Sequence, residues 1–330
     1  MKSKAKIVVV GSHAPGIFVR VKRIPKAGET VIGWDLHEPL DGGKGSNQAI
    51  AAARLGVETS FVGCLGRDRI GDEGERVLRE AHVDTTWMKR HESVHSGGGL
   101  IMLDENGVPA MITSMGANDE LTEEDVEMAL SASAPEAKVM LTQFEIPVDV
   151  ALYAARRASQ LGMISILNPA PAPEMVDFDL DGVGILIPNQ TESQGLLGQA
   201  PGEDYDATTL VKELKNKYHI PAVIVTLGEN GFVGIDDNGT WSQRAPKVDV
   251  QDTSGAGDSF CASLAVAISN GKSIREASIW ANHVAGLSVT RPGTIGSFPT
   301  LDEANYERYP PSEIPGHSNV GEAEIRGEIQ

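Results

Sequence analysis

Residues 252–260 read DTSGAGDSF, and an apolar run, CASLAVAIS, follows at 261–269. The run has the length and composition of a buried helix, so the cluster stands where that helix begins. Free N–H groups at a helix N-terminus attract anions, and Gly255 and Gly257 permit close approach to the backbone. A carboxylate there, Asp258, repels phosphate unless it has a task, such as taking a proton from an attacking hydroxyl. An ordinary capping carboxylate beside a glycine loop is the alternative.

A second glycine-rich cluster, DGGKGSNQAIAAARLG at 41–56, precedes an Ala-rich helical pattern. Its GGKGS core lacks the GxxxxGK[ST] spacing, which excludes a P-loop. Gly42, Gly43 and Gly45 would let a ligand approach the backbone, and Asn47 offers a hydrogen-bond donor and an acceptor. This combination favours a polyol over a phosphate. Glycines that serve only helix–sheet packing are the alternative.

Short β-branched runs alternate with amphipathic helical stretches through the chain. Near-continuous apolar strands with helices between them predict a mostly parallel sheet covered on both faces. Ligands of open α/β sheets bind at the carboxyl ends of strands, so Asn168, Asn189 and Gly228 are candidate lining residues. Strands are expected at 7–10, 139–144, 164–168, 185–189 and 222–228, and helices at 151–162 and 208–219.

Two segments break this alternation, at residues 11–41 and about 95–117, where strands and turns replace helices. The DENG tetrapeptide between apolar runs predicts a hairpin. We expect a small β layer that acts as a lid on a main domain spanning 1–303. The remaining residues, 304–330, lack an apolar period and are acidic, which is typical of a mobile or loosely docked tail.

Composition excludes several classes of partner and site. A formal net charge of −18 over 330 residues, without a basic stripe, argues against nucleic acid. No uninterrupted apolar run is long enough for a membrane span or a secretory signal. Cys64 and Cys261 are far apart and lack CxxC spacing, which argues against a disulfide framework or a zinc site and favours the cytoplasm.

GGKGSNQA and DTSGAGDSF together resemble the paired signatures of the ribokinase family, the PfkB-type carbohydrate kinases. Five further blocks agree in order: GCLGRDRIGDEG, QFEIP, PNQTES, TLGENG and VTRPGTIGSFPT. The resemblance covers residues 5 to about 303, and the ribokinases themselves are its nearest likeness. It implies a three-layer α/β/α fold with a mostly parallel central sheet and a small β-sheet lid.

The resemblance implies a role for each matching residue of the two signatures. Asp258 would take the proton from the sugar hydroxyl, while the N–H groups around Gly255, Ala256 and Gly257 would hold the transferring phosphoryl group. Carboxylate and helix terminus would thus serve opposite ends of one in-line transfer. The implied sugar-binding residues are Gly42, Gly43, Lys44, Asn47 and Glu145.

The resemblance also implies sites for ATP and for cations. Asn189 and Glu192 match the NxxE motif that organises Mg²⁺, water and the nucleotide phosphates; a plain first-turn acid is the alternative for Glu192. Thr226, Gly228 and Gly231 would lie along the nucleotide, with Asn282 near the adenine.

A monovalent cation, K⁺, would bind next to the helix start, mainly through backbone carbonyls. A plain structural loop is the alternative there. The residues at the corresponding positions are Asp252, Ser254, Ser288, Arg291, Gly293 and Ser297.

The chain departs from the ribokinases after the first strand. Their Asn-Ala-Asp step, whose aspartate grips two sugar hydroxyls, is replaced by Ala14, Pro15 and Gly16. Loss of this contact should weaken ribose binding by about one to two orders of magnitude. His13 could replace part of the contact or simply pack beneath the lid. The Gly-rich SGGGL at 96–100 leaves room for a different or bulkier substrate.

These features predict ATP-dependent phosphorylation of a primary hydroxyl of a ribose-like pentose or related sugar. The enzyme would require Mg²⁺, respond to K⁺ and form a homodimer through its lid. A kinase for nucleosides or for other sugars or sugar acids is one alternative. A catalytically idle sensor is the other, although it would have no need to keep Asp258.

Overall fold

The structure is a computed structural model that describes residues 6–38, 42–106, 108–172, 178–200 and 206–305. The tail predicted at 304–330 therefore lies outside the described residues, apart from its first two.

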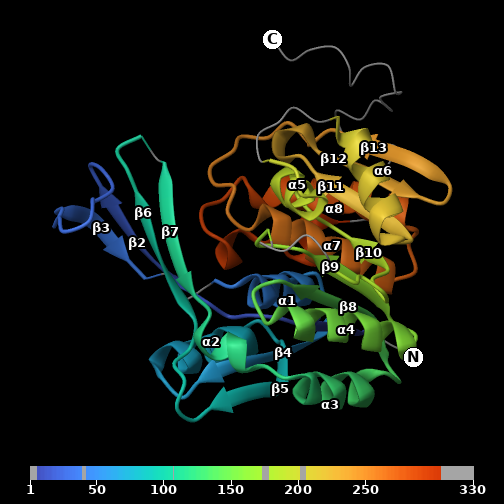
Figure 1. The fold of residues 1–330 in the computed structure, drawn as a ribbon, viewed down its shortest axis with the longest axis horizontal. Coiled ribbons are helices and arrows are strands. Elements are labelled where there is room, and N and C mark those ends of the chain that lie inside the picture. Colours follow the sequence, from blue (N-terminus) through green and yellow to red (C-terminus); the bar gives the residue numbers. More distant parts are fainter. Residues whose placement is uncertain (1–5, 39–41, 107, 173–177, 201–205, 306–330) are drawn as a thin grey trace.

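The main body is built on a nine-stranded sheet in the order β13-β12-β11-β10-β9-β8-β1-β4-β5 (Figure 1). The strands from β5 to β11 pair in parallel, and β12 and β13 add antiparallel pairs at one edge. The strands are β1 (Lys6–Val10), β4 (Glu58–Gly66), β5 (Asp84–His91), β8 (Ala137–Gln143), β9 (Ile164–Asn168), β10 (Ile185–Leu186), β11 (Ala222–Thr226), β12 (Phe232–Asp236) and β13 (Gly239–Gln243).

Helices cover both faces of this sheet, which confirms the predicted three-layer fold. Along β1 the side chains alternate, so that Ile7 and Val9 enter one apolar core and Val8 and Val10 the other. The first core includes α1 (Lys44–Arg54), α2 (Arg69–Glu80), α7 (Ala256–Ser269) and α8 (Ile274–Ser288). The second includes α3 (Glu123–Ser133), α4 (Val148–Gln160), α5 (Gln190–Leu197) and α6 (Ala207–Tyr218). A short helix, α9 (Leu301–Ala304), follows α8.

Two predicted strands end two or three residues earlier than the sequence pattern suggests. β10 stops at Leu186 instead of 189, because Pro188 has no N–H to donate and Asn189 caps α5. β11 stops at Thr226, because Gly228 takes a positive φ of 58° and begins the 3₁₀ turn η2 (Gly228–Asn230).

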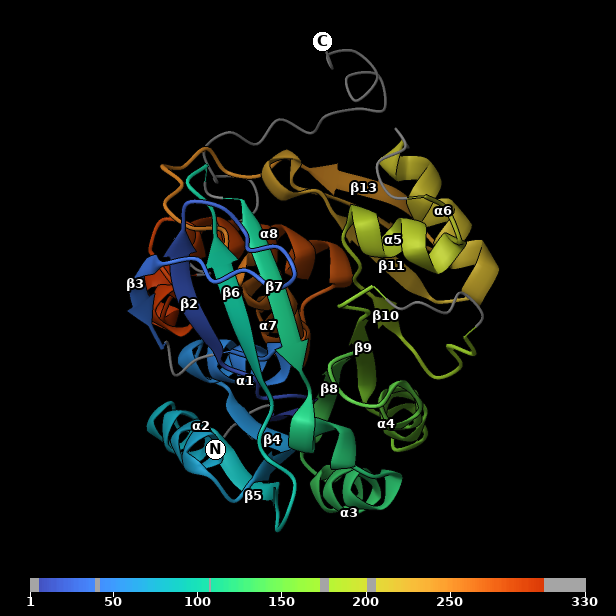
Figure 2. The ribbon, with the colours of Figure 1, turned by 60° about the vertical axis from the view of Figure 1, so that its left-hand side comes forward.

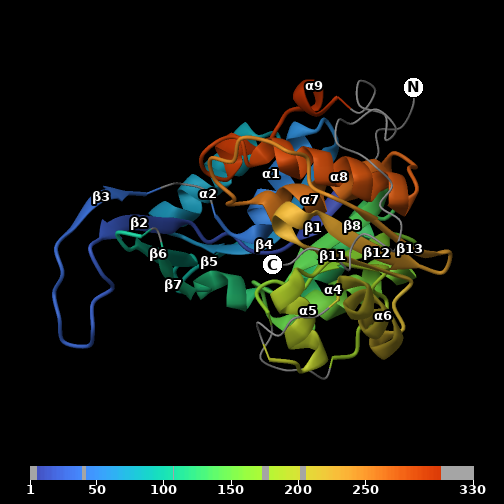
Figure 3. The ribbon, with the colours of Figure 1, turned by 90° about the horizontal axis from the view of Figure 1, so that it is seen from above.

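A second sheet of four strands stands beside the main body, in the order β3-β2-β6-β7 (Figures 2 and 3). It consists of β2 (Gly16–Val21), β3 (Gly33–His37), β6 (Gly98–Leu103) and β7 (Pro109–Ser114). β6 and β7 pair antiparallel across the DENG segment, as the hairpin prediction required. All four strands lie in the two segments predicted to form a lid, and we call them the small sheet.

The small sheet is tied to the main body at its base by the carboxylate of Asp68. That carboxylate caps α2 through the N–H of Gly71 and also accepts from the N–H and hydroxyl of Ser96, at 2.7 and 2.8 Å. Burial raises the pKa of Asp68, but these hydrogen bonds lower it further, to about 2. The carboxylate therefore stays ionised and keeps all three hydrogen bonds at neutral pH.

The strands of the small sheet keep large apolar side chains in solvent. Met111 and Ile112 are neighbours on β7 and point to opposite faces, yet each is 65% exposed. The other exposed apolar residues of this region are Ile17, Ile32, Trp34, Leu36, Leu100 and Val108. Within the described ranges, no helix combines the length and apolarity needed to cross a bilayer.

Candidate active site

A cavity of about 240 Å³ lies at the carboxyl ends of the main-sheet strands, where α1, α5 and α7 begin. Asn168 and Asn189, predicted from their strand ends to line a site, both line it, whereas Gly228 does not. The lining residues are Lys44, Asn168, Ala170, Ile187, Asn189, Glu192, Thr226, Thr253, Gly255, Gly257, Asp258 and Cys261.

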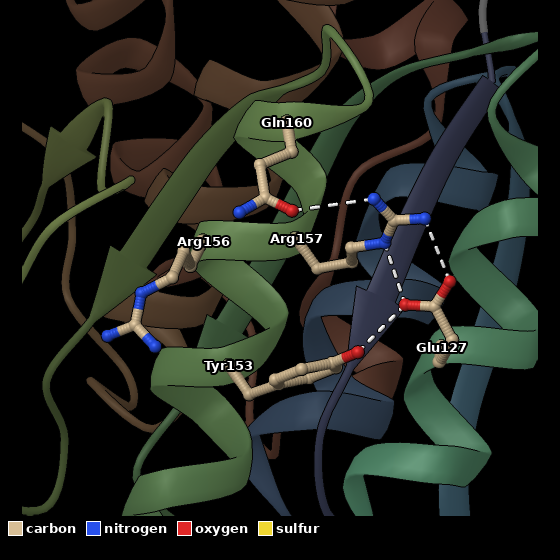
Figure 4. Close-up of a pocket in the computed structure, with 5 residues that line it drawn as sticks. All are labelled: Glu127, Tyr153, Arg156, Arg157 and Gln160. Carbon is tan, nitrogen blue, oxygen red and sulfur yellow. Dashed lines mark hydrogen bonds and ion pairs between the residues drawn. The ribbon is translucent and has the colours of Figure 1, made fainter.

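A hollow between α3 and α4 is of a different kind (Figure 4). Its Arg157 guanidinium donates to both oxygens of Glu127, at 2.7 and 2.8 Å, and the Tyr153 hydroxyl donates to the same carboxylate at 2.8 Å. These hydrogen bonds lower the pKa of Glu127 to about 2, and the bond from Arg157 has the largest effect. Because the charges of Arg157 and Glu127 pair with each other, this ion pair links α3 to α4, and the hollow is not our candidate site.

Asp258 lines the cavity from the first turn of α7, and two amide side chains of α1 hold its carboxylate. Its Oδ2 accepts from Asn47 Nδ2 and its Oδ1 from Gln48 Nε2, each at 3.0 Å. The side chain is only 6% exposed, and both partners are donors that suit an ionised carboxylate. Gln48 was not among the predicted residues, because a glutamine within an Ala-rich helix carries no periodic signal.

The helix that carries Asp258 begins directly after Gly255, which has a left-handed φ of 74° that favours glycine. A Cβ built there would lie 3.0 Å from the Phe298 ring. A Cβ built on Gly257 has no heavy atom within 4 Å among the described residues, so the first turn opens toward the cavity. With Ala256 as the first helical residue, the N–H groups of this turn have no intrahelical acceptor.

The glycines of the 42–45 segment pack against the chain that follows β1. Cβ atoms built on Gly42 and Gly43 would lie 2.5 Å from the backbone of Ala14, and one on Gly45 would lie 2.4 Å from the backbone of Ser12. Any side chain at these positions would overlap backbone. These glycines therefore have a packing role, and their contact with a ligand stays a prediction.

Lys44 and Glu145 meet where α1 begins. Glu145 Oε2 accepts from the backbone N–H of Lys44 at 2.7 Å and from the hydroxyl of Ser12 at 2.6 Å. Burial lowers the pKa of the Lys44 ammonium, but the carboxylates of Asp258, Glu145 and Glu192 together raise it above its ordinary value. Lys44 is thus a stable cation beside three carboxylates, and two of these, Asp258 and Glu192, line the cavity with it.

Asn189 and Glu192 form a capping box at the start of α5. The backbone and side-chain N–H groups of Asn189 donate to the two carboxylate oxygens of Glu192, and the Glu192 N–H donates back, all at 2.8 Å. Burial raises the pKa of Glu192, while Asn189 and Lys44 lower it less. Glu192 is therefore both a capping residue and a carboxylate of the cavity wall, and its role toward Mg²⁺ stays a prediction.

Three of the four residues predicted to contact the nucleotide, including Asn282 near the adenine, do not line the cavity. Gly228 and Gly231 flank η2, and a Cβ on Gly231 would collide with the carbonyl oxygen of Gln243. Asn282 is 6% exposed and donates to the carbonyl oxygen of Arg244 at 2.8 Å. Thr226 does line the cavity, next to Asn189.

The residues predicted to hold a monovalent cation lie in two loops joined by Asp252. Its carboxylate accepts from the N–H groups of Ser254 and Gly293, both at 2.9 Å. Burial raises the pKa of Asp252, but these bonds lower it more. The N–H of Arg291 donates to the Ser288 carbonyl, and its guanidinium pairs with Glu303. Ser297 is buried and donates to the Thr294 carbonyl.

His13 and Gly16 occupy the region where the chain departs from the ribokinases. His13 is 1% exposed, with Nδ1 3.0 Å from the Ser46 hydroxyl. It is a packing residue beneath α1, and the alternative of a replacement sugar contact finds no support. A Cβ built on Gly16 would lie 2.8 Å from Ile101, so a side chain there requires Ile101 to move.

The chain matches the model of the pfkB family carbohydrate kinases over residues 5–301. It is 34% identical over 301 residues to the ribokinase of Bacillus subtilis (strain 168), covering 90% of this chain and 97% of that protein. It is similar to the solved Arabidopsis thaliana ribokinase complexed with ribose and ATP, with a TM-score of 0.80, 31% identity and coverage of 92% and 97%. A nucleoside kinase of Methanocaldococcus jannaschii, 18% identical with a TM-score of 0.75, shares the fold. The resemblance noted in the paired signatures is thus confirmed, and the chain belongs to the pfkB family of carbohydrate kinases.

Proposed function

We propose that this carbohydrate kinase transfers a phosphoryl group from ATP to a primary hydroxyl of a ribose-like pentose or related sugar, with Asp258 as the base. The relatives named ribokinase and the Arabidopsis structure with ribose and ATP support this substrate class. The observation that carries the proposal is the position of a buried carboxylate at the open first turn of α7, in one cavity with Lys44.

In this proposal Asp258 accepts the proton of the attacking hydroxyl, while Asn47 and Gln48 keep its carboxylate aligned. The N–H groups of α7 around Gly255, Ala256 and Gly257 hold the migrating phosphoryl group at a helix N-terminus. Lys44 adds a positive charge near the developing negative charge. Rigid placement of these groups suffices, because phosphoryl transfer depends mainly on positioning and charge neutralisation.

Asn189 and Glu192 are proposed to hold Mg²⁺ and its water, and Mg²⁺ when bound neutralises charge on the phosphate oxygens. Each oxygen of Glu192 keeps a free lone pair after its bond to Asn189, so the capped carboxylate can still accept from a metal-bound water. Thr226 would lie along the phosphates, with Gly228, Gly231 and Asn282 further out toward the adenine.

The loops joined by Asp252 fit a site for K⁺. Their donor set consists of a carboxylate, hydroxyls and backbone carbonyls, which are the oxygen ligands that hard cations prefer. Because Asp252 lies just before α7, a bound cation would order the turn that begins that helix. The proposed ligand positions are Asp252, Ser254, Ser288, Arg291, Gly293 and Ser297.

The sugar is proposed to lie against the start of α1 and beneath the small sheet. Glu145 has a second oxygen, Oε1, with which to accept from a sugar hydroxyl, since the bonds from Ser12 and Lys44 both go to Oε2. Gly42, Gly43, Lys44 and Asn47 complete the proposed sugar site. Gly16 supplies no carboxylate, so ribose itself should bind weakly.

We also propose that two chains associate through the small sheet, which would act as a lid on the sugar site. A single chain leaves both faces of this sheet partly apolar and exposed, which marks an interaction surface. Association would bury Met111, Ile112 and their neighbours.

The test is a panel of pentoses, hexoses, sugar acids and nucleosides incubated with ATP and Mg²⁺, with ADP release as the readout. A sugar should give the largest kcat/KM, and K⁺ should raise it. A nucleoside as the best substrate would favour a nucleoside kinase. This is the second candidate, because Gly16 supplies no carboxylate for ribose and because a nucleoside kinase shares the fold. No ADP release with any acceptor would overturn the kinase proposal in favour of a sensor.

A further inference from the structure

We propose that Gln48 and Gln143 are positioning residues for Asp258, acting in series as a buried amide relay. The inference rests on the proposed function, because it assigns these glutamines a task only if Asp258 is the base. Both side chains are 0% exposed, and neither lines the cavity. They act on the reaction through Asp258 alone.

Gln48 is the direct contact. Its Nε2 donates to Asp258 Oδ1 at 3.0 Å, with a longer approach of 3.3 Å to Asn168 Oδ1. Asn47, the preceding residue of α1, donates to the other carboxylate oxygen. Two adjacent residues of one helix therefore fix both oxygens of Asp258, which leaves the carboxylate a single orientation toward the cavity.

A glutamine amide can face either way, and Gln143 is one of the neighbours that favour the direction in which Gln48 faces. Gln143 ends β8, and its Nε2 donates to Gln48 Oε1 at 2.6 Å. In the reversed orientation, Gln48 would turn its oxygen toward the carboxylate and its NH₂ toward the NH₂ of Gln143. Both contacts would be repulsive, so the donor from Gln143 keeps the NH₂ of Gln48 directed at Asp258.

Asn168 reinforces this direction from the neighbouring strand. It lies beside Gln143 in the parallel register of β8 and β9, and its Nδ2 donates to the carbonyl oxygen of Ile187 at 2.8 Å. Its Oδ1 is thereby turned toward the NH₂ of Gln48. The hydrogen bonds consequently run in one direction, from Gln143 to Gln48 to Asp258.

Gln143 is costly for stability alone. Its Oε1 is buried without a hydrogen-bond partner among the described residues, and an apolar side chain would avoid that penalty. The fold also makes room for the amide, because a Cβ on Gly11 would lie 2.2 Å from Oε1. A buried amide that lacks one hydrogen-bond partner, and for which the fold nevertheless leaves space, indicates a role in the active site rather than in core stability.

The experiment compares Gln48→Met, Gln143→Met and the double variant in steady-state kinetics with the best sugar of the panel. We expect kcat to fall about 10- to 100-fold in Gln48→Met and about 3- to 10-fold in Gln143→Met, with the sugar KM changed less than about 3-fold. Because Gln143 acts only through Gln48, the double variant should be no slower than Gln48→Met. Multiplying effects would indicate independent structural roles and overturn the relay.

The pH profile supplies a readout that a structural role would not move. Loss of a donor to Asp258 disfavours its ionised form, so the acid limb of kcat should move to higher pH in Gln48→Met. Gln48→Glu keeps the size of the side chain in case the methionine variant fails to fold. Its carboxylate should oppose Asp258, so its deficit relative to the parent should grow as pH rises. A constant deficit across pH would contradict the relay.

Thr142→Val is the matched control, because Thr142 is equally buried on β8 but points to the opposite face of the strand from Gln143. It should retain parental kcat. A parent chain that phosphorylates no acceptor would overturn the proposed function and the relay together. An active parent with an equally active Gln48→Met would overturn the relay alone.

Discussion

The main sheet and the small sheet treat their apolar side chains in opposite ways. Ile7 to Val10 of β1 are 0% exposed and lie between two helical layers, whereas Met111 and Ile112 of β7 are each 65% exposed. Asp258 and its cavity belong to the main body, where the side-chain amides of Asn47 and Gln48 hold the carboxylate in place. The difference teaches that phosphoryl transfer should need little beyond the main body. Substrate choice and association should depend on the small sheet.

The strongest test of this separation is Asp258→Asn. Loss of the base should lower kcat by about two to four orders of magnitude, while nucleotide affinity should change little, because the α7 turn remains. Steady-state kinetics and a nucleotide titration measure the two effects.

Asp236→Asn is the control, since Asp236, on β12, pairs with Arg275 of α8 and is not among the cavity-lining residues. It should retain parental kcat. If Asp258→Asn keeps parental activity, this carboxylate of the main body is not the base, and the proposed separation of roles is wrong.

The next effect concerns substrate choice. Gly16→Asp combined with Ile101→Val, which makes room for the new side chain, should tighten ribose binding by about 10- to 100-fold. The sugar KM and a direct ribose titration measure this, with kcat expected to change little. Ile101→Val alone is the control. If kcat rises and KM does not fall, the small sheet influences the chemistry itself and the separation is wrong.

A smaller effect on catalysis, but a clear one on assembly, is expected from Met111→Lys with Ile112→Lys. Two charges on the exposed strand should convert dimer to monomer without changing the Tm of the main body. Light scattering and thermal unfolding measure the two properties, and Met128→Lys, on the exposed side of α3, is the control. A parent chain that is already monomeric would contradict the proposed association.

The smallest effect is expected within the main body, from Glu127→Gln. The Arg157–Glu127 pair is partly exposed, so its loss should lower Tm by less than about 2 °C. The folded-state pKa of Glu127 is about 2, below its ordinary 4.5. Its contribution is therefore fully present above about pH 4.5 and lost as pH falls toward 2. The Tm difference between variant and parent should vanish at low pH; a difference that persists would contradict this.

Much of the fold could be predicted because its signals are local. The apolar run after Asp258 gave α7, the alternation of β-branched runs and helical stretches gave the parallel sheet, and DENG gave the β6–β7 hairpin. Each depends on periodicity or turn chemistry within about a dozen residues.

What could not be predicted depends on contacts between distant segments. Gln48 and Gln143 are 95 residues apart and look unremarkable in their own elements, so only the folded chain reveals their bond. The packing of the glycines at 42, 43 and 45 against residues 12–14 likewise appears only in the folded chain. For Glu192, capping and cavity lining give the same sequence pattern, so spacing alone could not separate them.

The bond from Asp68 to Ser96 has a consequence for how the small sheet can move. The same carboxylate begins α2, so releasing the base of the sheet would also uncap a helix of the main body. Because losing both contacts is costly at neutral pH, we expect the Ser96 end of the small sheet to stay in place. In the proposed closure over the sugar, the movement would come from the strands beyond Ser96, so the far tips of β6 and β7 would travel furthest.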